Sequence, residues 1–281
     1  MNEENESVPR RVLVALDAAS LSRHALEAAA KLAARMQAEL YGLFVEDDDL
    51  LRAAALPFVR QYSITGAGWH EFSIESLEHE LKIMASRARR TLEKAAQQAN
   101  VPASFHVARG PLTTQIVEAS QAADLIILQG SCRPLSRYLR MDAPSRAAVL
   151  RLDRSVLLLE AEVELPGHVV VIFDGTSTSM RALRLAARLA EALDGRLDIL
   201  LLVDETSGVA QLEANARSIV DRENVAVEFQ AVPIRDTIAL LSRMRQERPS
   251  LLVLSVASSI FSIPGQDGFI EALGCPLLLV R

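Results

Sequence analysis

The sequence predicts an α/β fold made of two tandem, doubly wound parallel-sheet domains, and three observations carry this prediction. Sliding the chain by 157 positions lays Asp17 on Asp174 and gives 14 identities over the 36 positions from Val12 to Asp47. Unrelated segments equally rich in Ala and Leu would share about four. Each copy alternates apolar runs of strand length with amphipathic stretches of helix length, as parallel strands require. The apolar runs are also continuous, which is typical of strands covered on both faces.

The first domain is expected to span residues 1–161. It opens with the strand Val12 to Leu16, and Ser20 or Ser22 is placed to cap the helix that follows. The buried stripe of that helix recurs at helical spacing and comprises Ala25, Ala29, Leu32, Ala33 and Met36. Four further strands are predicted, at Glu39 to Val45, Ala103 to Ala108, Leu125 to Leu128 and Val156 to Leu159.

The second domain is expected to span residues 167–281, after a boundary segment from Glu162 to Gly167. It repeats the order of the first domain in a shorter form. Its predicted strands are Val169 to Phe173, Arg196 to Val203, Ala226 to Val232, Leu251 to Leu254 and Pro276 to Val280.

The two copies differ mainly by an insertion in the first, within residues 46–100. It begins with a stretch expected to be irregular, around Pro57, Gly66, Gly68 and Trp69. A long helix follows, and its apolar positions lie on one side: Leu77, Leu81, Met84, Ala88, Thr91 and Ala95. This spacing favours packing on the domain's own sheet, and a coiled-coil seam to a partner is the alternative.

Composition and charge exclude several classes of protein. The net charge of −6 disfavours general binding to nucleic acid, because an acidic surface repels the phosphate backbone. The first residues are polar and acidic, and no apolar run is long enough to cross a bilayer. We therefore expect a cytoplasmic protein without membrane contact. Cys132 and Cys275 are too few and too far apart for a disulfide framework or a zinc site.

The order of motifs resembles the universal stress protein family in both halves. The residues that carry the resemblance are Val12 to Asp17 with Ser20 and Ser22, then Gly110-Pro111, then Ala123 to Gly130, and in the second copy Asp174 to Ser177 and Cys275 to Val280. The resemblance implies a Rossmann-like fold related to the adenine nucleotide alpha hydrolases. It also implies that the last strands of the two domains, Val156 to Leu159 and Pro276 to Val280, pair within one chain to form an intramolecular pseudo-dimer.

Some members of that family bind ATP, and the resemblance transfers their site to the first-domain cleft. The candidate cofactor-binding residues are Asp17, Val45, Gly110, Gly130, Ser131, Arg133 and Arg137. In ATP-binding members the triphosphate lies on a loop with the pattern Gly-x2-Gly-x9-Gly-Ser/Thr, where glycine lets the phosphate approach backbone N–H groups.

Both copies depart from that phosphate-binding pattern. The first copy keeps Gly130 but has Arg133 in place of the second glycine and Ala143-Pro144 in place of the final Gly-Ser. Pro144 removes a backbone donor from the start of the helix. The second copy has Ser255, Ser258 and Gly268-Phe269 at the same spacing. These departures disfavour ATP as the cofactor. The identity of any cofactor stays open.

Arginines collect between the last two strands of the first copy, at Arg133, Arg137, Arg140, Arg146, Arg151 and Arg154. They form either an anion site in place of the lost glycines or a solvated helix face. A run of four acidic residues, Glu46 to Asp49, is expected to cap the next helix rather than to bind a metal ion. Asp17 and Asp174 also have a purely structural interpretation, in which each side chain accepts hydrogen bonds from N–H groups of the turn that follows.

No constellation of residues indicates catalysis or metal binding. The five histidines, His24, His70, His79, His106 and His168, are dispersed, and none has a partner at the spacing of a triad or a metal pair. We therefore expect a non-catalytic stress-response or regulatory protein that acts through a protein partner, homo-oligomer or small ligand. The alternative is an ATP-binding module in the first-domain cleft, with arginines contacting the phosphates.

Overall fold

The computed structural model describes residues 11–16, 23–56, 60–63, 68–71, 74–129, 152–159, 167–193, 195–203, 208–221, 223–233, 249–258 and 275–281, with single positions at 240, 242 and 244. Within these residues, no helix is both long enough and apolar enough to span a bilayer.

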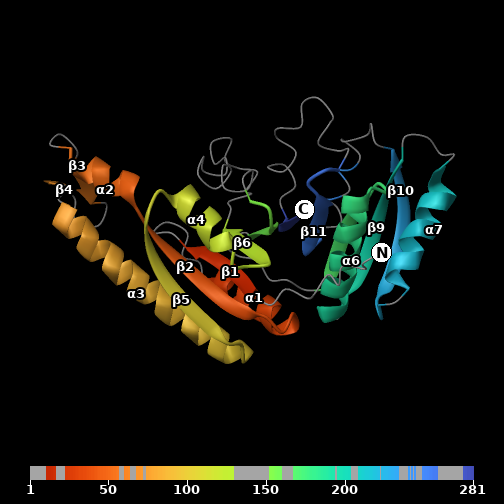
Figure 1. Cartoon of the computed structure of the whole chain (residues 1–281), viewed down its shortest axis with the longest axis horizontal. Helices are drawn as coiled ribbons and strands as arrows, with labels where there is room; N and C mark the ends of the chain where they lie inside the picture. Colours follow the sequence, from red (N-terminus) through yellow and green to blue (C-terminus); the bar gives the residue numbers. More distant parts are fainter. Residues whose placement is uncertain are drawn as a thin grey trace.

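A single ten-stranded sheet runs through the whole molecule in the order β10-β9-β8-β11-β12-β7-β6-β1-β2-β5 (Figure 1). The first half contributes β1 (Arg11–Leu16), β2 (Glu39–Asp47), β5 (Ala103–Gly110), β6 (Leu125–Gln129) and β7 (Ser155–Leu159). The second half contributes β8 (His168–Phe173), β9 (Arg196–Val203), β10 (Ala226–Pro233), β11 (Leu251–Ser255) and β12 (Leu277–Val280). The two halves have the same strand order, which confirms the predicted duplication. All ten strands lie where the sequence predicts them, with ends that shift by one or two residues.

The halves join through β7 and β12, which form the antiparallel pair of this sheet. Leu157 lies opposite Leu278, and Leu158 lies opposite Leu277. Every other strand pair within the sheet is parallel. The predicted pairing of the two last strands is therefore confirmed, and the chain forms a pseudo-dimer in which one sheet crosses the junction.

Helices cover both faces of the sheet, as expected for a doubly wound fold. One face packs against α1 (Arg23–Arg35), α3 (Ile74–Ala99), α6 (Ser177–Ala192) and α7 (Val209–Val220). The other face packs against α4 (Leu112–Ser120) in the first half and against Leu240 and Met244 in the second. All five residues predicted for the buried stripe of the first helix are at most 7% exposed.

The apolar stripe of the long inserted helix α3 packs on its own domain, as the spacing favoured. Leu77, Leu81, Ala88 and Ala95 are buried as predicted, together with Ala85, Leu92 and Ala96. Met84 and Thr91 are only partly buried, so the buried stripe is rotated from the predicted one. Gly42 on β2 makes the close approach of α3 feasible, because a Cβ at this position would lie 2.6 Å from Cδ1 of Leu92.

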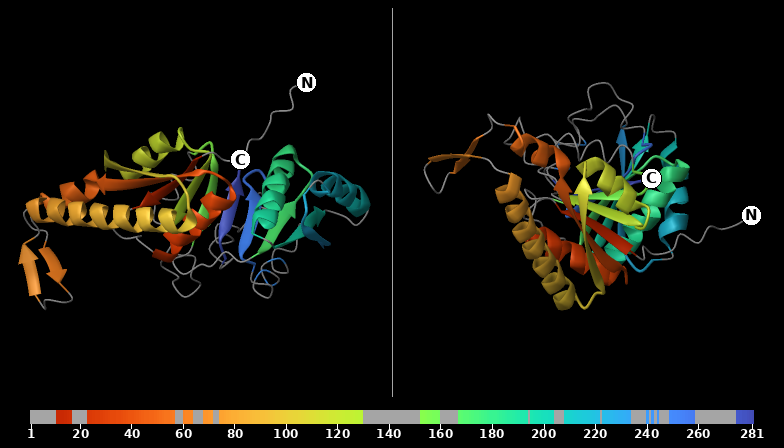
Figure 2. Two further views of the ribbon diagram at one scale, coloured as in Figure 1. Left: turned by 90° about the horizontal axis from the view of Figure 1, so that it is seen from below. Right: turned by 60° about the vertical axis from the view of Figure 1, so that its left-hand side comes forward.

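Part of the segment that precedes α3 is regular, contrary to the prediction, because Gly68 and Trp69 lie in a strand. Pro57 and Gly66 lie outside the described residues. The segment contains a short helix, α2 (Asp48–Ala54), and a separate antiparallel pair, β3 (Arg60–Ser63) with β4 (Gly68–Glu71). This hairpin projects from the end of the molecule (Figure 2). Pro57, Gly66 and Gly68 suggested loop structure because glycine and proline mark turns. Arg60–Ser63 and Gly68–Glu71 are only four residues each, too short to show alternation.

Candidate functional site

The border between β1 and β6 is the point where the winding of the first half reverses. From β1 the chain passes through α1 to β2 on one face, and from β5 it passes through α4 to β6 on the other face. Ligands in open α/β sheets bind at the carboxyl ends of the strands at such a switch point. β1 and β6 pair in parallel, with Val14 beside Ile127, so their carboxyl ends meet at the same edge.

Most of the predicted site residues lie outside the described residues. These are Asp17, Gly130, Ser131, Arg133 and Arg137. Asp17 directly follows Leu16, which ends β1, and Gly130 directly follows Gln129, which ends β6. The structure therefore pairs the two strands that the predicted binding residues Asp17 and Gly130 follow. Whether their side chains bind a ligand stays a prediction.

Val45 and Gly110 lie on two adjacent strands near the carboxyl edge. β2 continues two residues beyond Val45, because Glu46 pairs with Arg109 and Asp47 with Gly110. Val45 is therefore inside the strand, and its side chain is 2% exposed and packs in the core beneath α4. Gly110 has φ of 144° and lies immediately before the start of α4, beside the side chain of Gln115. Glycine suits this backbone conformation, which other residues rarely adopt.

The acidic run after β2 caps a helix, as predicted. The side chain of Asp47 accepts a hydrogen bond from the backbone N–H of Asp49, 3.0 Å away, at the start of α2. Asp48 and Glu78 both pair with Arg109, at 3.5 and 3.2 Å, which ties α2, α3 and β5 together. No group of three metal-ligating side chains occurs within the described residues. No sequence pattern predicted the role of Arg109, because its partners lie 61 and 31 positions away.

Asp174, the counterpart of Asp17 in the second half, is part of a turn. Its Oδ1 accepts hydrogen bonds from the N–H and the hydroxyl of Thr176, at 3.2 and 2.7 Å. Thr176 in turn caps α6, since its hydroxyl oxygen accepts from the N–H of Ser179. The structural reading of this aspartate is therefore confirmed. Gly175 at the same turn has φ of 77°, and a Cβ there would lie 2.8 Å from Leu212 of α7. α7 thus packs directly beside the turn that would line a second cleft.

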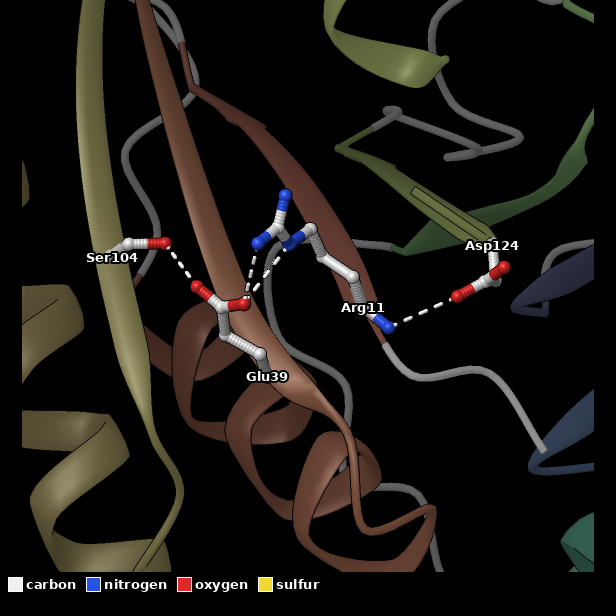
Figure 3. Close-up of polar contacts among 4 residues, drawn as sticks. All are labelled: Arg11, Glu39, Ser104 and Asp124. Atoms are coloured by element: carbon white, nitrogen blue, oxygen red, sulfur yellow. Dashed lines mark hydrogen bonds and ion pairs between the residues drawn. The ribbon is translucent and has the colours of Figure 1, made fainter. Parts of the chain in front are cut away.

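The amino edge of the first half carries a network of charged side chains (Figure 3). Arg11 donates two hydrogen bonds to Oε2 of Glu39, at 3.0 and 2.8 Å. Ser104 donates to the other carboxylate oxygen of Glu39. The backbone N–H of Arg11 donates to Asp124, 3.1 Å away. The hydrogen bond from Ser104 is the largest cause of a lowered pKa of Glu39; burial opposes it, and the hydrogen bond and charge of Arg11 lower the pKa further. The network joins four strands at the edge opposite the cleft.

The second half has a different network at the same place. His168 and Arg196 occupy the positions of Arg11 and Glu39 after the shift of 157, and Asp198 occupies that of Tyr41. Nε2 of His168 lies 2.8 Å from Oδ2 of Asp198, and an Arg196 nitrogen lies 3.5 Å from the same oxygen. The dispersed histidines gave no hint of this contact in the sequence, because strand pairing creates it. Its position far from the carboxyl edge makes it part of the scaffold.

Other residues singled out in the sequence add no group to the cleft. Cys275 is a buried cysteine, and Arg154 is exposed just before β7. Cys132 and the arginines at 133, 137, 140, 146 and 151 lie outside the described residues.

Comparison with known proteins identifies the family. The model of the universal stress protein family matches residues 9–159, which is more than half of the chain. The chain belongs to the universal stress protein family. No curated protein sequence in the comparison matches it. Among solved structures, a universal stress protein from Archaeoglobus fulgidus DSM 4304 superposes with a TM-score of 0.67 at 15% identity, with 96% of each chain covered.

A second solved structure shows the same tandem architecture. It is a functionally unknown protein from Pseudomonas aeruginosa PAO1, with a TM-score of 0.60 and 15% identity, covering 97% of this chain and 92% of the other. Identities this low concern the fold alone. This universal stress protein therefore shares its complete two-half architecture with solved structures, while the family model matches its first half.

Proposed function

We propose that this universal stress protein is a non-catalytic regulatory protein of the stress response that acts by binding a protein partner or a small ligand. We place it in the cytoplasm. The observation that carries the proposal is the bonding of Asp174, whose carboxylate oxygen holds Thr176 and thereby the start of α6. This bonding gives the aspartate a structural role in the turn.

The first half supports the same conclusion through its sequence and packing. Val45 is buried under α4, so its side chain offers no surface to an adenine ring. The loop after β6 carries Arg133 and Ala143-Pro144 where the ATP-binding pattern has glycines and Ser or Thr. A loop with fewer glycines presents fewer backbone N–H groups to a triphosphate.

The alternative is an ATP-binding module in the first half, and one observation favours it. β1 and β6 are adjacent and end at the same edge, so Asp17 and Gly130 follow neighbouring strands at the switch point. In this alternative the arginines after Gly130 supply the phosphate contacts that the missing glycines would have made.

A thermal-shift titration of the full chain with Mg·ATP separates the two functions. A ligand that binds only the folded state raises the melting temperature with its concentration. We expect no shift at millimolar ATP and no nucleotide in the mass spectrum of the purified protein. A shift that Asp17→Ala abolishes and Asp174→Ala retains would instead establish the ATP-binding module in the first half. Asp174→Ala is the matched control because it alters the equivalent turn of the other half.

A further inference from the structure

Helix α3 is the largest difference between the two halves, and only its inner face is used by the fold. It has 26 residues and is about 39 Å long, whereas its counterpart α7 has 12 residues. Its inner stripe is buried against α1, β2 and β5. Figure 1 shows α3 along the outer margin of the first half, away from the β7–β12 junction. The opposite, outward face carries exposed side chains, including Ile83 and Arg87, while Glu80 at its margin is partly buried.

An apolar residue sits in the middle of that outward face. Ile83 is 38% exposed, one of four large apolar side chains exposed among the described residues. At 100° per residue, Ile83 points about 180° away from Leu92, which is fully buried. Arg87 and Arg90 lie within about 40° of Ile83 on the same wheel, and Glu80 lies within about 60°. Ile83 therefore lies between an acidic and two basic side chains along this face.

The charges on the two sides of Ile83 have opposite signs. Glu80 precedes it, and Arg87, Arg90 and Lys94 follow it, while Glu75 and Glu93 lie about 80° from it at the edge of the face. None of these six side chains forms an ion pair in the described part of the chain, whereas Glu78 is paired with Arg109. On α7, by contrast, Glu213 and Arg217 pair within the helix at 2.6 Å. The outward face of α3 therefore presents unpaired acidic and basic groups in sequence.

We propose that this outward face of α3, around Ile83, is the docking surface for a second copy of the chain. The two α3 helices pack antiparallel about a two-fold axis that passes beside Ile83. With the axis level with the midpoint between residues 83 and 84, Glu80 of each helix lies level with Arg87 of the other. Arg90 then lies about 3 Å along the axis from the level of Glu75 of the other copy. Each Ile83 contacts its own counterpart.

Charge complementarity selects a second copy as the occupant. An order of acidic, apolar and basic groups along one helix is self-complementary when two such helices run antiparallel, because Glu80 of each copy then meets Arg87 of the other. A two-fold contact uses the same patch on both partners. Each chain has a single α3, so this contact closes at two copies and does not propagate into a filament.

Charge reversal in single and paired variants tests the surface in the full chain. Sedimentation velocity at about 100 µM protein should show a dimer, since small polar interfaces are weak and need high concentration. Glu80→Arg and Arg87→Glu should each raise the dimer dissociation constant at least about tenfold, because each places like charges together twice. The double variant Glu80→Arg/Arg87→Glu should restore dimerisation. Ile83→Asp should abolish it.

The controls make the outcome decisive. Arg181→Glu changes an exposed arginine of α6, outside the proposed surface, and should leave the dimer unchanged. Thermal melting checks that each variant is folded, and the charge-swap pair decides the question if Ile83→Asp does not fold. A monomeric wild-type protein would overturn the proposal. It would also be overturned if the double variant failed to restore a dimer that the single variants disrupt, or if a dimer persisted in folded Ile83→Asp.

Discussion

Nε2 of His168 lies 2.8 Å from Oδ2 of Asp198, whose side chain is buried on β9. The other oxygen of Asp198 is buried and has no hydrogen-bond partner in the structure described. Burying a carboxylate costs free energy unless it is paired, and the contacts with His168 and Arg196 offset this cost for Asp198. In the first half, Tyr41 occupies the same place and needs no ion partner of this kind.

The first prediction concerns this pair. His168→Ala should lower the free energy of unfolding by about 2 kcal/mol or more, because it leaves Asp198 buried with only the more distant Arg196. The double variant His168→Ala/Asp198→Leu should be more stable than His168→Ala, since the unpaired charge is gone. Urea denaturation measures both values. Equal stability of the wild type and His168→Ala would show that the contact has no energetic role.

The second prediction concerns the pH dependence of the Arg11–Glu39 network. The pKa of Glu39 is lowered from its ordinary value of 4.5 in the folded state. A lowered pKa means that the carboxylate stabilises the fold above pH 4.5 and loses this contribution as the pH falls through the lower, folded value. Glu39→Gln should therefore cost about 1 kcal/mol at pH 7, and this cost should shrink as the pH falls below 4.5.

Urea denaturation across this pH range checks the second prediction. Glu93→Gln serves as a control, because Glu93 is exposed on α3 and has no ion pair among the described residues. Its effect should be small at every pH. A Glu39→Gln penalty that stayed constant down to pH 3 would contradict the role assigned to the network.

The third prediction concerns the contact between β2 and α3. A Cβ at Gly42 would lie 2.6 Å from Cδ1 of Leu92 and 2.9 Å from Cδ2 of Phe105. Leu92 is fully buried and has little room to move. Gly42→Ala should therefore cost about 1–3 kcal/mol through overpacking. In Leu92→Ala the space is open, so Gly42→Ala added to that variant should cost less. A double-mutant cycle by chemical denaturation measures this coupling, and additive values would rule it out.

The fourth prediction concerns the junction between the halves. Cutting the chain at an engineered protease site near Pro166 should leave the two halves associated, because β7 and β12 pair along their lengths. Each half expressed alone should expose that apolar edge strand and aggregate or pair with itself. Size-exclusion chromatography with light scattering distinguishes these states. Halves that remain soluble monomers would contradict the prediction.

Sequence patterns were sufficient for the main sheet, for physical reasons that particular residues illustrate. Buried parallel strands such as Val169 to Phe173 form continuous apolar runs, and α1 repeats its alanines at helical spacing. The shift of 157 then indicated that the second half repeats the elements of the first in the same chain order. The hairpin was missed because four-residue strands such as Gly68–Glu71 carry too few positions to show a period of two.

The candidate site was less predictable than the fold. The resemblance to the family indicated β1 and β6 as the strands that lead into the candidate site, because Asp17 and Gly130 match its motif. The sequence also left two readings for Asp174, and only the hydrogen bonds to Thr176 decide between them. Contacts such as Arg109 with Glu78, or His168 with Asp198, depend on strand register and helix position. No local pattern records those three-dimensional relationships.

The pairing of β7 with β12 has a consequence for how the two halves change over evolutionary time. In a dimer of separate subunits, dilution dissociates the partners, and identical chains share every substitution. Here the partners are tethered, so their effective concentration is fixed by the linker and no subunit exchange occurs. Each half is then free to acquire its own features while the other preserves the junction. The α3 insertion in one half and the His168–Asp198 contact in the other are the visible result of that independence.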